Sequence, residues 1–382
     1  MEQTMHDRSS SQPHEALADV AARIAPPNED ARRAAVDKWN AVAKPIGSLG
    51  VLEDDVAAIA ALTGAPDVCI DKRAVIVLCA DNGVVAQGIS QCGAEVTRAV
   101  AVSVGKGVSS VCSMAHKQGI DAIGVNIGML DPTDLPGGVG AAFPAPVPGL
   151  IERPVANGTA DISVGPAMTR EQALQALHTG INLVGELKEQ GYQLLVSGEM
   201  GIGNTTTSSA MTAALLGLPV EEVTGRGAGL DDEGLKRKVA VIKRALEVNE
   251  PDANDALDVL SKLGGFDIAG LAGLFIGGAV HRVPVVIDGY ISALSAYTAS
   301  RLVPSCTQAM LASHMSAEPA ARIIMEALGL TAPIQAGLRL GEGTGGICLV
   351  PLIDMALGLY NGITFDDSNI EAYDPDLSPS NE

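Results

Sequence analysis

The pattern that most constrains the fold of this chain is a short apolar run followed by a polar or glycine-rich cluster, repeated several times. Continuous apolar runs of this length are typical of buried strands in a parallel sheet. We predict such strands at Ala74–Ala80, Ala122–Ile127, Gln193–Ser197, Val283–Ile287 and Ile334–Leu340. Segments between and after them predict helices at Glu95–Val104, Val108–Gln118, Glu171–Gln190, Thr205–Leu216, Glu233–Val248, Tyr290–Arg301, Ala317–Leu328 and Ile347–Leu359. This alternation predicts an α/β fold with a doubly wound, mostly parallel sheet.

The two ends of the chain lack this pattern. We expect residues 1–13 and the acidic tail from Asp366 to be unstructured. Asn28 is a suitable N-cap, and Trp39 is expected to anchor its helix on a core. Helices are predicted here at Glu15–Ile24 and Asp30–Val42, with a third that ends at Leu62. Within the α/β part, Asp131–Asp161 is rich in proline and glycine and predicts a long loop.

Charge and cysteine content exclude several classes of protein. The formal net charge is −20, which argues against a nucleic-acid partner or an anionic membrane. The six cysteines show no C-x-x-C spacing and predict buried free thiols rather than disulfides or a zinc site. No signal peptide is visible, and the longest apolar run, Ile268–Val280, is too short to span a bilayer. We therefore expect a cytoplasmic protein.

The polar clusters after the predicted strands indicate one functional site. They are Asp81-Asn82-Gly83, Ser197–Thr207, Asp288-Gly289 and Gly341-Glu342-Gly343. Because the carboxyl ends of parallel strands share one edge of a sheet, these clusters are expected to converge on a single crevice.

The glycines around Glu342 also match a dinucleotide-binding pattern, G-x-G-x-x-G. That motif needs a second strand with an acidic residue roughly 20 positions later, and here the chain has almost ended. A carboxylate between glycines is better suited to hold a proton against a ligand than to cradle a phosphate, which it would repel. A glycine turn with an incidental surface glutamate is the plain alternative.

Three segments are predicted helix starts, and the first of them can bind an anion. The glycines of Gly198–Thr207 permit close approach of a ligand, Asn204 can cap the next helix, and the three threonines offer hydroxyls; an ordinary capped helix is the alternative. Ser316 is a suitable N-cap for the helix predicted after it. Asp231 and Asp232 are expected to cap another helix start, whose Lys238 either reaches an anionic ligand or is solvated.

Several separated motifs agree with one family. They are Lys44–Gly50, Ala80–Ser90, Gly198–Thr207, Gly225–Lys238, Gly264–Gly273, His281–Gly289, Ser313–Pro319 and Leu340–Gly345. Through them the sequence closely resembles the nicotinate-nucleotide–dimethylbenzimidazole phosphoribosyltransferases, which build the lower-ligand nucleotide of cobalamin. One departure is Asn82, because the family commonly has histidine there, and this leaves the base preference open.

The resemblance implies a homodimer whose subunits have two domains. A large Rossmann-like domain would comprise residues 71–349, and a small helical domain residues 1–70 and 350–382. The implied reaction transfers phosphoribose from nicotinate mononucleotide to 5,6-dimethylbenzimidazole, gives α-ribazole 5′-phosphate and nicotinate, and needs no metal or other cofactor. Transfer to another aglycone, such as adenine or a phenol, and a non-catalytic nucleotide-binding relative remain alternatives.

The resemblance also assigns roles to residues. Glu342 falls on the catalytic base and Glu199 on its companion carboxylate, while Met200 and Leu340 can grip the flat aromatic ring and Ser90 can line the same pocket. Asp288 can hold ribose hydroxyls, and Lys238 can pair with a carboxylate or phosphate of the substrate. The phosphate is expected to bind to Gly201, Gly203, Asn204, Thr205 and Ser316.

Overall fold

This computed structural model describes residues 15–227 and 229–371 of the chain. The prediction for residues 1–13 lies outside the described residues, as does the tail beyond residue 371. The prediction for the start of the tail is wrong, because Phe365–Ser368 forms a short helix, α15. Thr364 and Asp367 form a capping box that explains this helix, since each side chain bonds to the other's backbone N–H.

The core of the fold is a six-stranded sheet in which all neighbouring strands are parallel. The strands are β1 (Arg73–Ala80), β2 (Asp121–Gly128), β3 (Ile151–Glu152), β4 (Leu194–Met200), β5 (Val285–Ile287) and β6 (Met310–Ala312). Their spatial order is β3-β2-β1-β4-β5-β6, so the order of the strands reverses between β1 and β4. The α/β fold with a parallel sheet is therefore confirmed.

Two strands differ from the prediction. Ile334–Leu340 is not a strand: only Ile334 pairs, in an isolated bridge with His314, and glycine at 337 has a positive φ that turns the chain away. The last strand is instead β6, whose three residues are too few to show a periodic pattern. β3 is a two-residue edge strand inside the long loop predicted at Asp131–Asp161.

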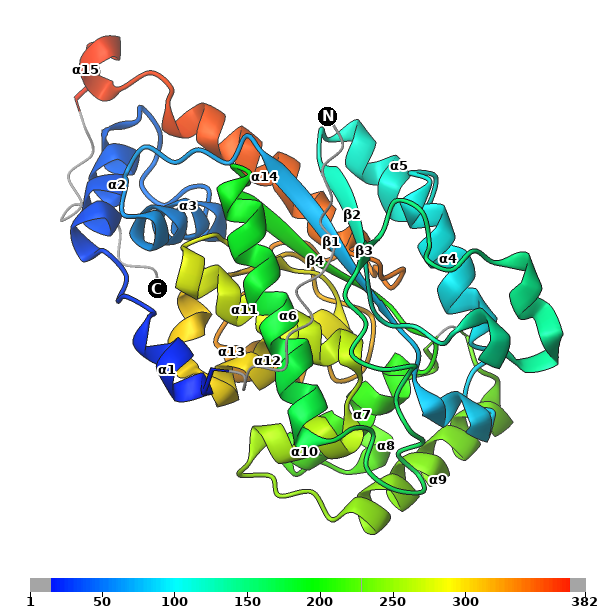
Figure 1. Cartoon of the computed structure of the whole chain (residues 1–382). Coiled ribbons are helices and arrows are strands. Elements are labelled where there is room, and N and C mark those ends of the chain that lie inside the picture. The colour runs from blue at the N-terminus through cyan, green and yellow to red at the C-terminus, as the bar shows by residue number, and fades with distance from the viewer. Residues whose placement is uncertain (1–14, 228, 372–382) are drawn as a thin grey trace.

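The sheet is buried on both faces, as the alternation along β1 shows. Ala74, Ile76 and Leu78 belong to one core cluster, whereas Val75 and Val77 belong to another. Figure 1 shows helices on both sides of the sheet, with α6 and α11 in front and α14 behind. The first cluster is closed by α1 (Leu17–Ala22), α6 (Arg170–Glu189), α7 (Asn204–Leu216), α8 (Val220–Val223), α9 (Asp232–Asn249), α10 (Ala256–Leu263), α11 (Phe266–His281), α12 (Tyr290–Leu302) and α13 (Ala321–Leu328). The second is closed by α4 (Glu95–Gly105), α5 (Ser110–Lys117) and α14 (Thr344–Tyr360), with one residue of α3 (Val51–Thr63).

Helix α11 explains the longest apolar run of the sequence. It is buried along almost its whole length and packs against α6. A Cβ at Gly273 would lie 2.0 Å from the carbonyl oxygen of Leu177, so glycine is required for the two helices to approach this closely. None of the helices among the described residues has the length and apolar character needed to span a membrane.

A third core cluster joins the two ends of the chain. It contains Trp39 of α2 (Glu29–Ala41) and Tyr360 of α14, whose ring centroids are 4.9 Å apart. Asn28 caps α2 as predicted, and Val42 pairs with Thr364. Figure 1 accordingly shows α2 and α3 beside the far end of α14. The anchoring role of Trp39 is confirmed, because the ring is 2% exposed.

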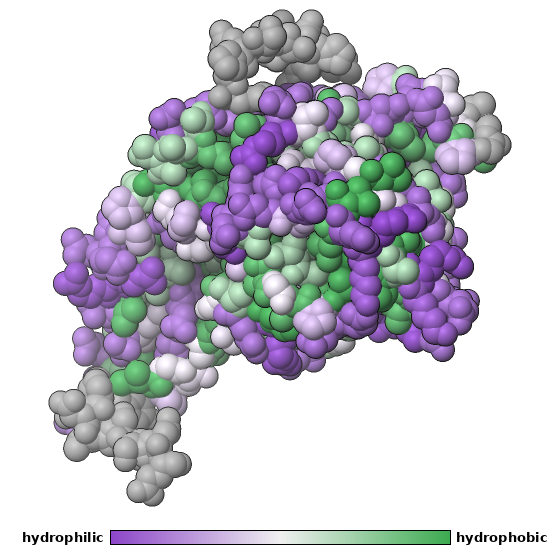
Figure 2. All heavy atoms as spheres, turned by 90° about the horizontal axis from the view of Figure 1, so that it is seen from below, coloured by the Kyte–Doolittle hydropathy of each residue, from purple (hydrophilic) through white to green (hydrophobic). Residues whose placement is uncertain are grey.

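The hydropathy of the surface and the burial of the cysteines can be compared with the sequence predictions. The face in Figure 2 is mostly hydrophilic, with apolar side chains gathered near its middle. All six cysteines are free; Cys79, Cys112 and Cys306 are buried, but the prediction is wrong for Cys69, which is exposed.

Candidate active site

Glu342 lies against the carboxyl end of β4, although no strand precedes it. A Cβ at Gly198 would lie 2.5 Å from the carbonyl oxygen of Glu342, so glycine in β4 makes room for this turn. Glu342 has a φ of 61°, and glycines flank it at 341 and 343, also with positive φ. Such a left-handed conformation is uncommon outside glycine and indicates a turn that its surroundings hold in place.

Asp288 stabilises the turn at Glu342. It follows β5, and its carboxylate accepts hydrogen bonds from the backbone N–H groups of Gly343, at 3.2 Å, and Gly346, at 2.8 Å. These N–H groups belong to the start of α14. Asp288, which follows β5 and is distant in sequence, therefore caps this helix. Burial raises the pKa of Asp288, while the neighbouring His314 opposes this shift in pKa. Both carboxylate oxygens of the residue predicted to hold ribose are thus engaged with the backbone.

Glu199 and Glu342 lie close together. A Cβ at Gly341 would lie 3.2 Å from Oε1 of Glu199, and Gly341 directly precedes Glu342. The other Glu199 oxygen accepts a hydrogen bond from Nδ2 of Asn204. Burial raises the pKa of Glu342, with a contribution from Asp288. Burial and the charge of Asp267 raise the pKa of Glu199 to about 8.

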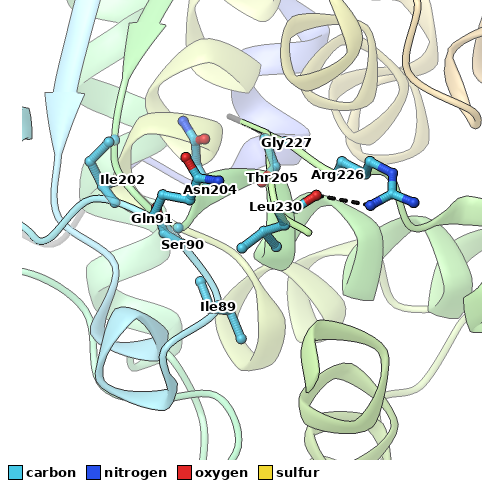
Figure 3. A pocket seen from close by; sticks show the side chains of 11 residues that line it. Ile89, Ser90, Gln91, Ile202, Asn204, Thr205, Arg226, Gly227 and Leu230 are labelled. Carbon is cyan, nitrogen blue, oxygen red and sulfur yellow. Dashed lines mark hydrogen bonds between the residues drawn. The ribbon is translucent and has the colours of Figure 1, made fainter. Parts of the chain in front are cut away.

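A small pocket lies at the start of α7, and Asn204, the hydrogen-bond partner of Glu199, is one of the residues that line it. It contains five of the predicted residues together with six others, namely Ser90, Gly201, Gly203, Asn204 and Thr205 with Ile89, Gln91, Ile202, Arg226, Gly227 and Leu230. In Figure 3, Ser90, Gln91 and Asn204 gather on one side, and Arg226 extends away from them. The Arg226 guanidinium donates to the carbonyl of Leu230 at 2.9 Å. Backbone N–H groups at a helix start and nearby hydroxyls can bind an anion such as phosphate.

Lys238 reaches this pocket from α9. Its Nζ donates to Oγ1 of Thr205 at 2.9 Å and to the carbonyl of Gly225 at 3.2 Å. The side chain is 1% exposed, so the solvated alternative is wrong. Burial lowers the pKa of Lys238 to about 8, while the charge of Glu318 opposes that shift in pKa. At neutral pH the ammonium group therefore remains charged beside the hydroxyl of Thr205.

Two predicted helix caps are wrong. Gly203, in a left-handed conformation, precedes α7, and Asn204 is the first helical residue. Its side chain is thereby free to face Glu199. Helix α13 begins at Ala321 with Ala320 before it, so Ser316 does not cap it. Asp231 does cap α9, as predicted, by accepting from the N–H of Gly234.

The other predicted residues are spread around the acids. Met200 ends β4 and is partly buried, whereas Leu340 is 57% exposed. Ser316 is buried, and its hydroxyl accepts from the N–H of Glu318 at 3.4 Å. Asn82 follows β1 and is 2% exposed. Within the described residues, no group of three or more His, Cys, Asp and Glu side chains is arranged to hold a metal ion.

The sequence interpretation missed Asp267, which lies in the same network. Nδ2 of Asn204 donates to Oδ2 of Asp267 at 2.9 Å, and the side chain of Asp267 is fully buried. The sequence feature that could have identified Asp267 is that it is the single acid in the apolar segment Gly264–Gly273. Arg226 and Gly227 were likewise inside a noted motif but had no assigned role.

Comparisons with known proteins extend over nearly the whole chain. A model of the phosphoribosyltransferase family matches residues 24–370. The nicotinate-nucleotide–dimethylbenzimidazole phosphoribosyltransferase of Acetivibrio thermocellus is 46% identical over 341 residues, which are 89% of this chain and 94% of that protein. The protein of the same name from Ruminiclostridium cellulolyticum is 43% identical over 91% of this chain and 96% of its own length. The crystal structure of CobT from Thermus thermophilus matches with a TM-score of 0.82 at 35% identity, covering 90% of this chain and 100% of that one.

Proposed function

The chain belongs to the family of nicotinate-nucleotide–dimethylbenzimidazole phosphoribosyltransferases, and from this premise we propose a mechanism in which Glu342 is the general base. The enzyme acts in cobalamin synthesis and transfers phosphoribose from nicotinate mononucleotide to 5,6-dimethylbenzimidazole. The observation that carries the mechanism is the position of Glu342 against β4 and beside Glu199, whose partner Asn204 lines the pocket at the start of α7.

The reaction needs one base and no acid at the leaving group. One nitrogen of the benzimidazole bonds to C1′ of the ribose, while its other nitrogen loses a proton to the Glu342 carboxylate. The C1′ bond to nicotinate breaks, and its electron pair neutralises the pyridinium charge. Attack from the face opposite nicotinate inverts C1′ and gives α-ribazole 5′-phosphate. General base catalysis of this kind contributes about 10²–10⁴-fold.

The phosphate of the nucleotide is assigned to the pocket at the start of α7. Gly201, Gly203 and Thr205 present backbone and hydroxyl groups there, and Lys238 adds a positive charge through Thr205. Hydrogen bonds that involve a charged group are about twice as strong as neutral ones. Ser90 lines the same pocket, and Met200 and Leu340 are assigned to the aromatic ring, with Ser316 near the phosphate.

The position of the site supports a Rossmann-like, doubly wound fold. The strand order β3-β2-β1-β4-β5-β6 has its switch point between β1 and β4, where such folds bind their ligands. Asn82 follows β1, and Glu199 is the second-last residue of β4, which pairs with β1. A small helical domain from both chain ends is supported by the separate core cluster around Trp39 and Tyr360.

A homodimer is supported by large apolar side chains exposed near the carboxyl end. Met355, Ile363 and Ile370 are 64%, 59% and 60% exposed. Association would cover apolar surface that is otherwise in contact with water. Light scattering after size-exclusion chromatography distinguishes a dimer from a monomer directly.

The test of the function is a product assay. The purified protein is incubated with nicotinate mononucleotide and an equimolar mixture of benzimidazoles, adenine and phenols, and the products are identified by mass. We expect α-ribazole phosphate and nicotinate in equal amounts. The Glu342→Gln variant should bind nicotinate mononucleotide with unchanged affinity but turn over about 10²–10⁴-fold more slowly. Unchanged turnover in that variant contradicts the assignment of the base.

A further inference from the structure

Two buried carboxylates at the site share a single amide group. Nδ2 of Asn204 donates one hydrogen to Glu199 and the other to Asp267. Asp267 is fully buried and Glu199 is 9% exposed. Among residues 15–227 and 229–371, neither acid forms an ion pair with a Lys, Arg or His side chain. Two anions this close repel each other in a desolvated site, so the pair retains one proton at neutral pH.

The surroundings decide which acid holds that proton. Asp267 lies in the first turn of α11, where backbone N–H groups favour an anion. Glu199 lies near the end of β4 and has no helix start of its own. Burial accordingly raises the pKa of Asp267 only to about 6, whereas the pKa of Glu199 rises to about 8. Glu199 is the protonated member of the pair.

The remaining titratable groups around Glu199 favour the same state. They are Asp288 after β5, Glu342 before α14 and Cys79 of β1, with Asp81 acting on Asp267 and His314 acting on Asp288. Of these groups, Asp288 and Glu342 act directly on Glu199, and their negative charges oppose a further charge there. Lys238, the nearby cation, donates instead to Thr205 and Gly225.

We propose that Asp267 is a positioning residue for the transfer reaction: through the amide of Asn204 it fixes the Glu199 side chain, and through its own negative charge it keeps that side chain in the protonated form. This inference rests on the proposed function. Glu342 is then the single carboxylate that accepts the proton of the incoming base, and Glu199 presents an O–H donor beside it. A second anion there would repel the carboxylate of the nicotinate group and make Glu342 harder to ionise.

The test is the pH profile of kcat/KM for dimethylbenzimidazole at saturating nicotinate mononucleotide, which removes the effect of Lys238 on nucleotide binding. In the unmodified enzyme we expect activity to fall above about pH 8, as Glu199 loses its proton. In Asp267→Asn, Glu199 ionises more easily, so the fall begins lower. If the alkaline fall of Asp267→Asn is shifted down by about one pH unit, its activity is about tenfold below that of the unmodified enzyme near pH 9 and nearly equal to it near pH 6. A purely structural role would lower activity equally at every pH, and that result overturns the inference.

The matched control is Asp55→Asn, the same substitution at another buried acid. Asp55 lies in α3, and burial together with Asp54 raises the pKa of Asp55 to about 7. We expect this variant to keep the pH profile of the unmodified enzyme. A shifted alkaline limb in Asp55→Asn would mean that loss of any buried acid changes the profile, which also overturns the inference.

Glu199→Gln tests the inference even if Asp267→Asn fails to fold. Glutamine has the same shape, stays neutral, accepts from Asn204 and donates into the pocket. We expect near-neutral activity within about tenfold of the unmodified enzyme, no alkaline fall, and no further change when Asp267→Asn is added. Loss of activity at every pH would show that Glu199 acts as an anion and would refute the inference. An unmodified protein that never consumes nicotinate mononucleotide refutes the proposed function instead.

Discussion

Asp288→Asn separates two roles that one carboxylate can have at this site. In the structure both Asp288 oxygens accept backbone hydrogen bonds from the start of α14 and so hold the Glu342 turn. The sequence instead predicts that Asp288 binds ribose hydroxyls. Asparagine keeps the size of the side chain but has one accepting oxygen, so it can satisfy only one of Gly343 and Gly346.

The expected effect on stability is smaller than the two bonds suggest. Hydrogen bonds to a charged group contribute about 1.5–3 kcal/mol each. Burial raises the pKa of Asp288, however, so the folded protein bears a cost for this anion that asparagine removes. We therefore expect a net loss of about 1 kcal/mol, the size of an ordinary N-cap substitution. Activity should respond more strongly, because a displacement of about 1 Å at a catalytic group can lower the rate about 10²-fold.

The assay is steady-state kinetics with both substrates varied. We expect kcat to fall about 10–100-fold while KM for nicotinate mononucleotide stays within about threefold, and little further loss when Glu342→Gln is combined with Asp288→Asn. Asp255→Asn is the control, because Asp255 also accepts from two backbone N–H groups, at the start of α10. Both of these bonds go to the single Oδ1, which asparagine retains, so the control should lose less stability than Asp288→Asn and keep kcat. A large rise in KM with an unchanged kcat would refute the positioning role and favour ribose binding.

Three further substitutions test the packing, the phosphate pocket and the pH dependence of stability. Gly198→Ala should displace the Glu342 turn and lower kcat at least tenfold, as measured by steady-state kinetics. Its control is Gly358→Ala, inside α14 with open space around it, which should stabilise the folded protein by about 0.5–1 kcal/mol in urea unfolding. Lys238→Met should raise KM for nicotinate mononucleotide about 10–150-fold with a smaller effect on kcat, and an unchanged KM would exclude the cation from nucleotide binding. Burial raises the pKa of Asp55 to about 7, so the stability it contributes when protonated is lost as pH rises between about 4 and 7. Asp55→Asn should therefore stabilise more at pH 8 than at pH 4.5, and equal gains in urea unfolding would contradict the assigned pKa.

Continuous apolar runs predicted the strands that are long and buried on both faces. β1, β2 and β4 have seven or eight residues, and each was predicted within three residues at either end. β6 has three residues and β3 has two, and such short strands are defined by their neighbours rather than by their own pattern. The prediction of a strand at Ile334–Leu340 was wrong because this segment forms only one isolated bridge, at Ile334, and its Leu340 is 57% exposed.

The strand ends predicted much of the site, because parallel strands place their carboxyl ends at one edge. That argument correctly brings Glu199 and Asp288 toward Glu342, although Glu342 itself follows a loop. It could not find Asp267, which comes from a helix that packs on a face of the sheet. Its contact with Asn204 depends on where α11 and α7 begin relative to each other, and no local pattern in either segment encodes that.

The net charge of the whole chain is −20, but an anionic substrate responds mainly to the charges close to the site. Burial and the charge of Asp267 raise the pKa of Glu199 to about 8, so this acid adds no negative charge at neutral pH. Lys238 remains positive at neutral pH and lies within hydrogen-bonding distance of Thr205. Surface charges beyond about 8–10 Å are screened at physiological salt, whereas these short contacts are not. The field that a phosphate meets is therefore determined by local donors and by the protonated Glu199, and raising the pH above about 8 should remove the charge of Lys238 and the proton of Glu199 together.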